Sequence, residues 1–192
     1  MPSPHPRASN PVETEAKIRV TSFSTLKRRI SAGGGRLLSG RALETNTLFD
    51  DATGSLRAAG KSFRVRRYGK AGLVTLKGAP RVVSGLKSRV EVETGVESPD
   101  VLERILVMLG FRPLFRYQKF REVWSFRRAV ICFDDTPLGK FLEIEGTDAV
   151  IHRVAKSLGL SSDAFLATSY PALWLEAGRT GDMVFPTKAA TA

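Results

Sequence analysis

Charged side chains occupy every second position in six short stretches of this sequence. The first stretch runs from residue 12 to 18, where Glu13, Glu15 and Lys17 alternate with small or apolar residues. A β-strand points alternate side chains to opposite faces, so each stretch would place its ions on one face of a sheet. The other five carry Arg64 and Arg66; Thr75 and Lys77; Arg89, Glu91 and Glu93; Lys119 and Arg121; and Glu143 with Glu145. A sheet face with both signs of charge suits a highly charged ligand.

The residue types on this face indicate the chemistry. The cations are Lys17, Arg19, Arg64, Arg66, Lys77, Arg89, Lys119 and Arg121, and the anions are Glu13, Glu15, Glu91, Glu93, Asp134, Glu143 and Glu145. Carboxylates suit a hard divalent metal ion, and guanidinium and ammonium groups suit phosphate oxygens. A metal ion on a chain of phosphates would satisfy both sets, as phosphoryl or nucleotidyl transfer requires. Asp135 is the alternative to Asp134 as the aspartate on this charged face. Its position in the alternation places its side chain on the opposite face, so we favour Asp134.

The charged face is expected to point inward. Alternating charge on a single strand usually indicates a half-exposed sheet, but here the charges come as same-sign neighbours, such as Glu13 with Glu15 and Arg64 with Arg66. Such neighbours repel one another unless a counter-ion binds between them, whereas solvated surfaces mix the signs. Two predicted helices, 98–109 and 147–158, also carry apolar stripes that need an apolar sheet face. The helices should therefore pack outside the sheet, and the charges should line a polar lumen.

The elements that would position these residues are short strands and a few helices. We expect strands at residues 12–21, 41–49, 62–68, 73–77, within 83–94, and at 115–126, 129–133 and 141–145. We expect helices near 25–31, at 98–109 and 147–158, and from about Ser162 through Phe165, Leu166, Tyr170 and Leu173. This order predicts an α+β fold in which about eight antiparallel strands curl toward closure. The domain should span 12–175, between a disordered tail at 1–11 and a flexible tail at 176–192.

Composition limits the partners and cofactors. The net charge of +11 favours anionic partners. The single cysteine, Cys132, has no partner and there are only two histidines, which excludes a disulfide framework, a histidine relay and a zinc site. Any metal must be held by oxygen atoms, which selects Mg²⁺ or Mn²⁺. No apolar run is long enough to span a membrane and the first residues are polar, so we expect a cytoplasmic protein without a membrane partner.

Six motifs, in order, resemble the CYTH family, also called triphosphate tunnel metalloenzymes. They are Glu13-x-Glu15-x-Lys17, Phe63 to Arg66, Leu73 to Gly78, Arg89 to Glu93, Leu109-Gly110-Phe111 followed by Lys119-x-Arg121, and Phe133 to Gly146. The resemblance covers about residues 12–170. It implies an eight-stranded tunnel in which a triphosphate is held by Lys17, Arg64, Arg66, Lys77, Arg89, Lys119 and Arg121. It also implies that one or two Mg²⁺ or Mn²⁺ ions are bound by Glu13, Glu15, Asp134, Glu143 and Glu145, with Glu91 and Glu93 adding to the metal site or pairing with cations.

The family includes triphosphatases and class IV adenylate cyclases, and the residues above suit both. Our leading hypothesis is metal-dependent hydrolysis of a nucleoside, inorganic or thiamine triphosphate, with Lys17 orienting or deprotonating the attacking water. The alternative is a cyclase that converts ATP to cyclic AMP, although Pro11 stands where many of these cyclases have histidine. A thiamine substrate is less favoured, because Lys188 lies in the tail. A remoter alternative is a non-catalytic binder of polyphosphate or nucleic acid, using Lys27 to Arg29 and Arg127 with Arg128. The protein should be a monomer or a homodimer.

Overall fold

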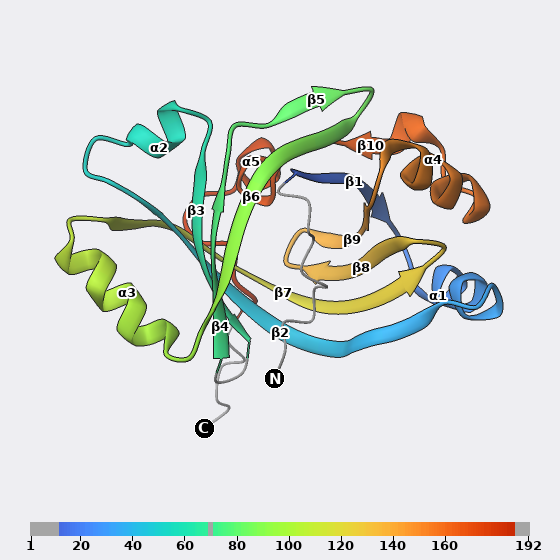
Figure 1. The fold of residues 1–192 in the computed structure, drawn as a ribbon, viewed down its shortest axis with the longest axis horizontal. Helices are drawn as coiled ribbons and strands as arrows, with labels where there is room; N and C mark the ends of the chain where they lie inside the picture. The colour runs from blue at the N-terminus through green and yellow to red at the C-terminus, as the bar shows by residue number, and fades with distance from the viewer. Residues whose placement is uncertain (1–11, 69–70, 187–192) are drawn as a thin grey trace.

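The computed structural model describes residues 12–68 and 71–186, so the tail expected at 1–11 and the last part, 187–192, of the tail expected at 176–192 lie outside the described residues. Two long strands, β2 and β7, carry much of the sheet (Figure 1). The strands are β1 (Val12–Val20), β2 (Arg36–Asp50), β3 (Ser62–Tyr68), β4 (Ala71–Lys77), β5 (Arg81–Val83), β6 (Leu86–Val96), β7 (Arg112–Phe126), β8 (Ala129–Thr136), β9 (Gly139–Glu145) and β10 (Phe165–Leu166). The helices are α1 (Ser24–Ala32), α2 (Ser55–Ala58), α3 (Pro99–Met108), α4 (Asp148–Ser157) and α5 (Tyr170–Glu176), with a 3₁₀ turn at Ser162–Ala164.

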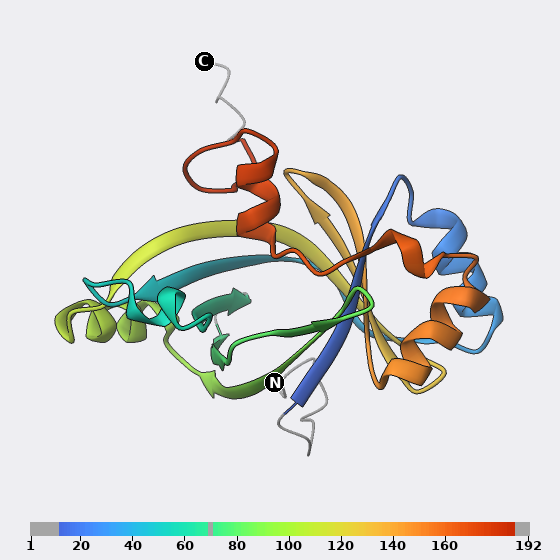
Figure 2. The same cartoon turned by 90° about the horizontal axis from the view of Figure 1, so that it is seen from above.

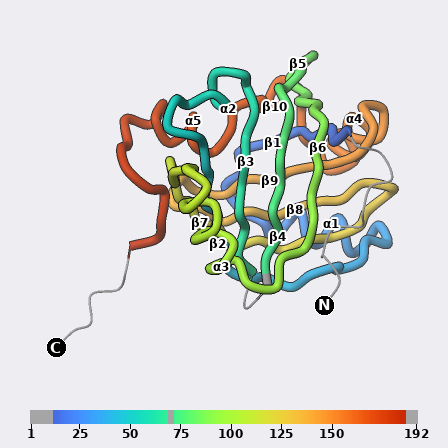
Figure 3. The backbone as a smooth tube through the Cα atoms, turned by 60° about the vertical axis from the view of Figure 1, so that its left-hand side comes forward, coloured from blue at the N-terminus to red at the C-terminus, as the bar shows by residue number. Residues whose placement is uncertain are grey.

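Eight antiparallel strands close into a barrel. Their order is β1-β9-β8-β7-β2-β3-β4-β6, and β6 pairs back onto β1, with Val12 opposite Val90 and Glu15 opposite Lys87. In Figure 3, β3, β4 and β6 form the near wall and cross in front of β1, β9 and β8. The short strands β5 and β10 extend the free edges of β6 and β1. The predicted α+β fold with a closed eight-stranded sheet is confirmed.

Many of the apolar residues between the charges are buried beneath helices outside the sheet, whereas Leu76, Val90 and Val92 on β4 and β6 remain exposed. On β1, β8 and β9 the buried residues include Ile18, Phe133, Leu142 and Ile144, each at most 1% exposed. They pack with the apolar faces of α1 and α4, which lie side by side at one end of the molecule (Figure 1 and Figure 2). At the other end, α3 packs against β3 and β4 in a smaller cluster. The predicted position of the helices outside the sheet is therefore confirmed.

The prediction of a helix that begins at Ser162 is wrong for the first half of that segment. The Ser161 side chain accepts a hydrogen bond from the Asp163 backbone, which closes only a single 3₁₀ turn. Residues 165 and 166 then form β10, because the end of β1 beyond its pairing with β6 offers free backbone groups there. Helix α5 begins later, where Ser169 caps it by accepting a hydrogen bond from Ala172 N and Pro171 occupies its first turn.

Part of the segment that the sequence assigned to a flexible tail, 176–192, contacts β7 through Asp182, Met183 and Phe185. Met183 is 0% exposed, and its backbone exchanges hydrogen bonds with Arg116 O and Gln118 N at 2.9 and 2.8 Å. Its side chain belongs to an apolar cluster with Tyr117, Phe141, Tyr170 and Leu173 at the end of the barrel beneath α5. Figure 2 shows α5 above this end. None of the helices in the described ranges has the length and apolar character of a membrane span.

A charged lumen as the candidate functional site

One cavity occupies the barrel, and its lining residues reach the rims at both ends, which we call the first and the second mouth. Antiparallel pairing brings the start of β1 and β2 and the end of β9 to the same rim. This first mouth is lined by Val12, Arg36, Leu38, Leu73, Arg128 and Thr147. The second mouth lies at the end of β2 and the start of β7, beside α5. It is lined by the apolar residues Leu48, Phe115, Pro171, Ala172 and Leu175, and also by Asp50, Arg57, Lys61 and Ser62. The buried charged side chains lie between the two mouths.

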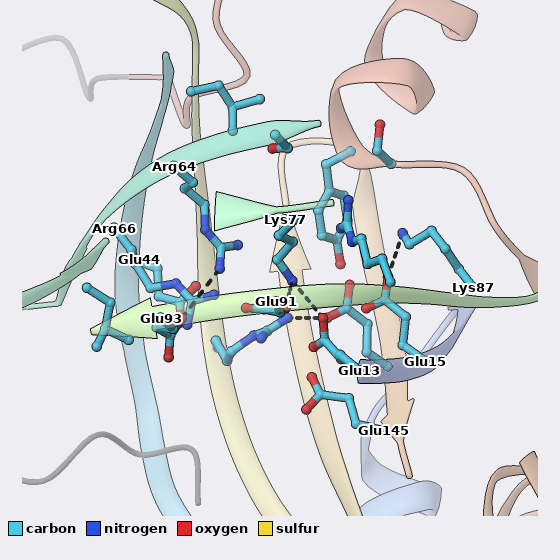
Figure 4. Close-up of a pocket in the computed structure, with 18 of the residues that line it drawn as sticks. Glu13, Glu15, Glu44, Arg64, Arg66, Lys77, Lys87, Glu91, Glu93 and Glu145 are labelled. Atoms are coloured by element: carbon cyan, nitrogen blue, oxygen red, sulfur yellow. Dashed lines mark hydrogen bonds and ion pairs between the residues drawn. The ribbon is translucent and has the colours of Figure 1, made fainter. Parts of the chain in front are cut away.

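Three of the predicted metal ligands form one group, which we call the acidic triad. Carboxylate oxygens of Glu13, Glu15 and Glu145 lie within 4.8 Å of one another. The pairing of β1 with β9 places Glu15 directly opposite Glu145, and Glu13 lies two residues nearer the first mouth on the same face. Figure 4 shows the three side chains converging from the two strands. Because all three stand at the ends of β1 and β9, the triad lies on the side of the lumen that faces the first mouth.

The electrostatics of the triad fit a divalent cation. Burial and the nearby Glu13 raise the pKa of Glu145 to about 8. Burial also acts to raise the pKa of Glu15, but Lys87 and Lys17 hold it below its ordinary value, and Lys87 Nζ lies 2.5 Å from the Glu15 carboxylate. The raised pKa of Glu145 reflects its burial and the negative charge of the neighbouring glutamates, which a bound cation would offset. Three convergent carboxylate oxygens are a suitable donor set for Mg²⁺ or Mn²⁺.

The predicted phosphate-binding cations line the same lumen. Lys77 Nζ lies 2.7 Å from Glu13 and 2.5 Å from Glu91, so it bridges the acidic triad to β6 (Figure 4). Arg64 donates to Tyr117 Oη at 3.2 Å and to Thr75 Oγ1 at 3.4 Å. The cations at most 7% exposed are Lys17, Arg64, Arg66, Lys77, Lys87, Lys119 and Arg121. Arg89 is half-buried, and its buried Nε has no hydrogen-bond partner among the described residues.

The other two predicted metal ligands, Asp134 and Glu143, lie with the cations. Asp134 is 0% exposed and accepts hydrogen bonds from Lys119 Nζ at 2.8 Å, Arg121 Nε at 2.6 Å and Tyr170 Oη at 2.7 Å. Glu143 pairs with Arg121 and lies 3.4 Å from Lys17 Nζ. Burial opposes ionisation of Glu143, but Arg121 and Lys119 hold its pKa well below the ordinary value. These two carboxylates therefore fix the positions of three cations.

The remaining predicted residues fall on both sides of the sheet. Glu93 accepts a hydrogen bond from Thr75 at 2.8 Å inside the lumen. Asp135 lies on the outer face, 3.1 Å from Arg41, as the alternation indicated. Arg19, which we expected in the lumen, is exposed instead, donates to Leu138 O and stacks on the Phe141 ring. It stands near the end of β1, beyond the enclosed part of the barrel.

The lumen also contains residues that the sequence did not indicate: Glu44, Asn46, Lys87, Tyr117 and Tyr170. Glu44 is 1% exposed and lies 3.6 Å from both Arg66 and Lys119. Its strand alternates glutamate and asparagine with threonine, so both faces look polar in the sequence. Lys87 extends the alternation of Arg89, Glu91 and Glu93 by one step and was detectable from that signal. Tyr170 comes from α5, and no periodicity predicts that a helix outside the barrel sends a side chain into it.

Comparison with known proteins places the chain in a family. The model of the CYTH domain matches residues 12–166. The chain belongs to the CYTH family. A protein of Methanocaldococcus jannaschii named putative adenylate cyclase is 24% identical over 170 residues, which cover 83% of this chain and 96% of that protein.

Two solved CYTH-like structures share the fold. A putative adenylate cyclase of Vibrio parahaemolyticus has a TM-score of 0.74 at 20% identity, over 85% of this chain and 97% of the other. A protein of Hippeastrum, described as a putative adenylyl cyclase with a dominant triphosphatase activity, has a TM-score of 0.59 at 18% identity, over 88% of this chain and 97% of the other. Both activities therefore occur among the names given to proteins of this shape.

Proposed function

We propose that this protein is a metal-dependent triphosphatase that removes the terminal phosphate from a triphosphate-containing compound. One observation carries the proposal: the acidic triad of Glu13, Glu15 and Glu145 shares a single lumen with buried cations that are already oriented. Phosphoryl transfer needs little covalent chemistry from the protein, and depends on positioning and on neutralising charge. A lumen with separate binding sites for a metal ion and for phosphate oxygens meets both needs.

The residues of the chain have distinct tasks in this reaction. Arg64, Lys119 and Arg121 bind phosphate oxygens. Asp134 pairs with Lys119 and Glu143 pairs with Arg121, which keeps these two cations from pairing with the acidic triad. Lys17 is held by Glu143 and by Thr168 O at 3.2 Å, which directs its ammonium group at the phosphates or the attacking water. A divalent ion held by the triad would supply Lewis-acid stabilisation of the phosphoryl oxygens. Water adds to the terminal phosphorus, the bond to the bridging oxygen breaks, and orthophosphate, the diphosphate and one proton are released.

Class IV adenylate cyclase is the second candidate, because the relatives from Methanocaldococcus jannaschii and Vibrio parahaemolyticus carry the name putative adenylate cyclase. In that reaction the ribose 3′ oxygen of ATP bonds to the α-phosphorus and pyrophosphate leaves. The same cations and carboxylates would serve it, since both reactions need a neutralised triphosphate. The two candidates differ in which phosphorus is attacked.

Product analysis separates the candidates. The purified protein is incubated with Mg²⁺ or Mn²⁺ and with ATP, inorganic triphosphate or thiamine triphosphate, and the products are resolved by chromatography. We expect orthophosphate, a need for the divalent ion, and a fall of about 100-fold or more in kcat for Glu145→Gln. The matched control is Asp135→Asn, which changes a carboxylate on the outer face. Cyclic AMP with pyrophosphate would support the cyclase, and no turnover of any compound would refute both candidates.

A further inference from the structure

Helix α3 is apolar on nearly all of its sides, although it lies on the surface of the molecule. Leu102 and Leu106 face the sheet and belong to the smaller apolar cluster on β3 and β4. Val101, Ile105 and Met108 face away from this cluster and are 52%, 46% and 86% exposed. A surface helix normally has polar residues on its outer side, and a helix that is apolar all round is normally covered on both sides. The outer face of α3 is therefore a surface that another molecule would cover.

The exposed apolar side chains of α3 form one stripe, which we call the α3 stripe. Val101, Ile105 and Met108 stand at positions i, i+4 and i+7, a spacing that places them on the same side of an α-helix. The stripe is about 10 Å long at a rise of 1.5 Å per residue. Val107 and Leu109, 55% and 69% exposed, widen the apolar surface beside it. This spacing is typical of the seam along which two helices pack.

The charged residues near the stripe change sign along the helix. The exposed acids stand at its start and the exposed cations stand toward and beyond its end, in the order Glu97, Asp100, Arg104 and Arg112. An antiparallel copy of the same helix would place each acidic start against a basic end, and opposed helix dipoles add to this attraction. About a twofold axis through the centre of the stripe, Val101 would meet Met108 of the partner subunit. Asp100 would come within reach of Arg104 of the partner subunit, so the surface is self-complementary.

The distribution of charge over the molecule favours a second copy of this chain as the occupant. Two copies repel each other over most of their surface, because each has a net charge of +11. Helices α1 and α4 carry the exposed cations Arg28, Arg29, Arg153 and Lys156, and the only acid on these two helices is Asp148.

The surface around α3 is balanced by comparison. The acids there are Glu97, Asp100 and Glu103, and the cations are Arg67, Arg104 and Arg112. Figure 1 and Figure 2 show α3 at the end of the molecule opposite α1 and α4, so contact through α3 keeps the two basic ends far apart. The acids beside the stripe also disfavour an anionic membrane as the occupant.

We propose that the protein forms a homodimer in which the α3 helices of two copies pack antiparallel about a twofold axis, with the α3 stripe at the centre of the interface. The dimer does not depend on the activity proposed for the lumen, because none of the described residues that line the cavity comes from Pro99–Met108. The interface is isologous, so each copy contributes the same apolar stripe and the same two pairs of opposite charge.

The test is the mass in solution, measured by sedimentation at several concentrations of the full chain. We expect the wild type to have twice the mass of one chain and to dissociate on dilution. Met108→Glu should raise the dimer dissociation constant about 100-fold or more, because it places an unpaired charge in a desolvated contact. The Met108 side chain is 86% exposed in one chain, so this substitution removes little packing from the monomer. The matched control is Leu37→Glu, which changes an apolar side chain that is 53% exposed at the start of β2, near α1, and should leave the constant unchanged.

A charge exchange tests the antiparallel arrangement. Asp100→Arg and Arg104→Glu should each raise the dissociation constant about tenfold, because each sets like charges against each other in both copies of the pair. The double variant should restore the wild-type constant, since the pair between subunits is reversed but intact. Arg67 keeps Glu103 as its partner in all of these variants.

Four results would overturn the proposal. The first is a wild type that remains monomeric at concentrations up to about 1 mM. The second is a dimer that Leu37→Glu weakens as much as Met108→Glu does. The third is a double charge variant that dimerises no better than the two single variants. The fourth is a monomeric wild type that sediments with phosphatidylcholine vesicles while Met108→Glu does not, which would assign the α3 stripe to a lipid surface.

Discussion

Replacement of Asp134 by asparagine would remove a fully buried negative charge from beside Lys119 and Arg121. The carboxylate is 0% exposed, and its hydrogen bonds from Lys119, Arg121 and Tyr170 measure 2.5 to 2.8 Å. Loss of one partner of a buried ion pair costs about 3 to 5 kcal/mol, because the remaining charge stays buried without compensation. Glu143 still pairs with Arg121, and Glu44 still lies 3.6 Å from Lys119, so we expect the lower end of that range, about 3 kcal/mol.

The assay is urea denaturation with a chelator present, followed by tryptophan fluorescence. The matched control is Asp135→Asn, since this carboxylate is half-buried on the outer face and pairs with Arg41, and its loss should cost less than about 1 kcal/mol. Tyr170→Phe is a milder variant that deletes one hydrogen bond to Asp134 and should cost about 1.5 kcal/mol. If Asp134→Asn costs no more than Asp135→Asn, the reasoning about the buried cluster is refuted.

Metal affinity separates a structural role of Asp134 from the metal-binding role that the sequence suggested. Glu145→Gln removes a member of the acidic triad, so it should weaken Mn²⁺ binding, measured by calorimetry, about tenfold more than Asp134→Asn does. An Asp134→Asn protein that remains folded but loses Mn²⁺ affinity to the same extent as Glu145→Gln would show that Asp134 is a metal ligand after all.

Two further predictions concern the triad and the C-terminal segment. The pKa of Glu145 is raised to about 8 in the metal-free protein, so its folded form binds an extra proton between about pH 4.5 and 8, and stability should fall as the pH rises through this window. In chelator, Glu145→Gln should abolish this part of the pH dependence in urea titrations, and Mn²⁺ should restore stability at pH 8 in the wild type only; an unchanged pH profile in the variant would contradict the assignment. Met183→Ala should lower the free energy of unfolding by about 2 to 3 kcal/mol, because the side chain is 0% exposed and packs beneath α5. A loss below about 0.5 kcal/mol, as for a surface residue, would place residues 177–186 in the flexible tail that the sequence suggested.

The barrel was predictable because charges mark the inner face of its strands. In β1 the alternation of Glu13, Glu15 and Lys17 with Ala16 and Ile18 fixes both the strand and its orientation, and the apolar stripes of α3 and α4 fix the side on which helices pack. Strand β10 was not predictable in the same way, because two residues carry no period. Its pairing depends on the free edge that β1 presents only after the barrel has formed.

Alternation gives the face of a side chain but not its neighbours along the lumen. Asp134, Glu143 and Glu145 share the inner face, yet only Glu145 joins the acidic triad among these three. The difference arises from register: Glu145 lies opposite Glu15, whereas Glu143 lies opposite Lys17 and Asp134 lies opposite Arg121. Register between strands far apart in the sequence depends on the whole closed sheet, so a single sequence cannot supply it.

The pairing of β1 with β9 has a consequence for how the protein folds. The acidic triad joins the first strand of the barrel to its last, so it cannot assemble until nearly all of the barrel has emerged from the ribosome. Closure of such distant strands is slow, and β1 must wait in contact with solvent and other chains during that time. The charge at every second position of β1 disfavours pairing with strands of other molecules in this interval. We therefore expect Glu13, Glu15 and Lys17 of β1 to limit aggregation of the nascent chain as well.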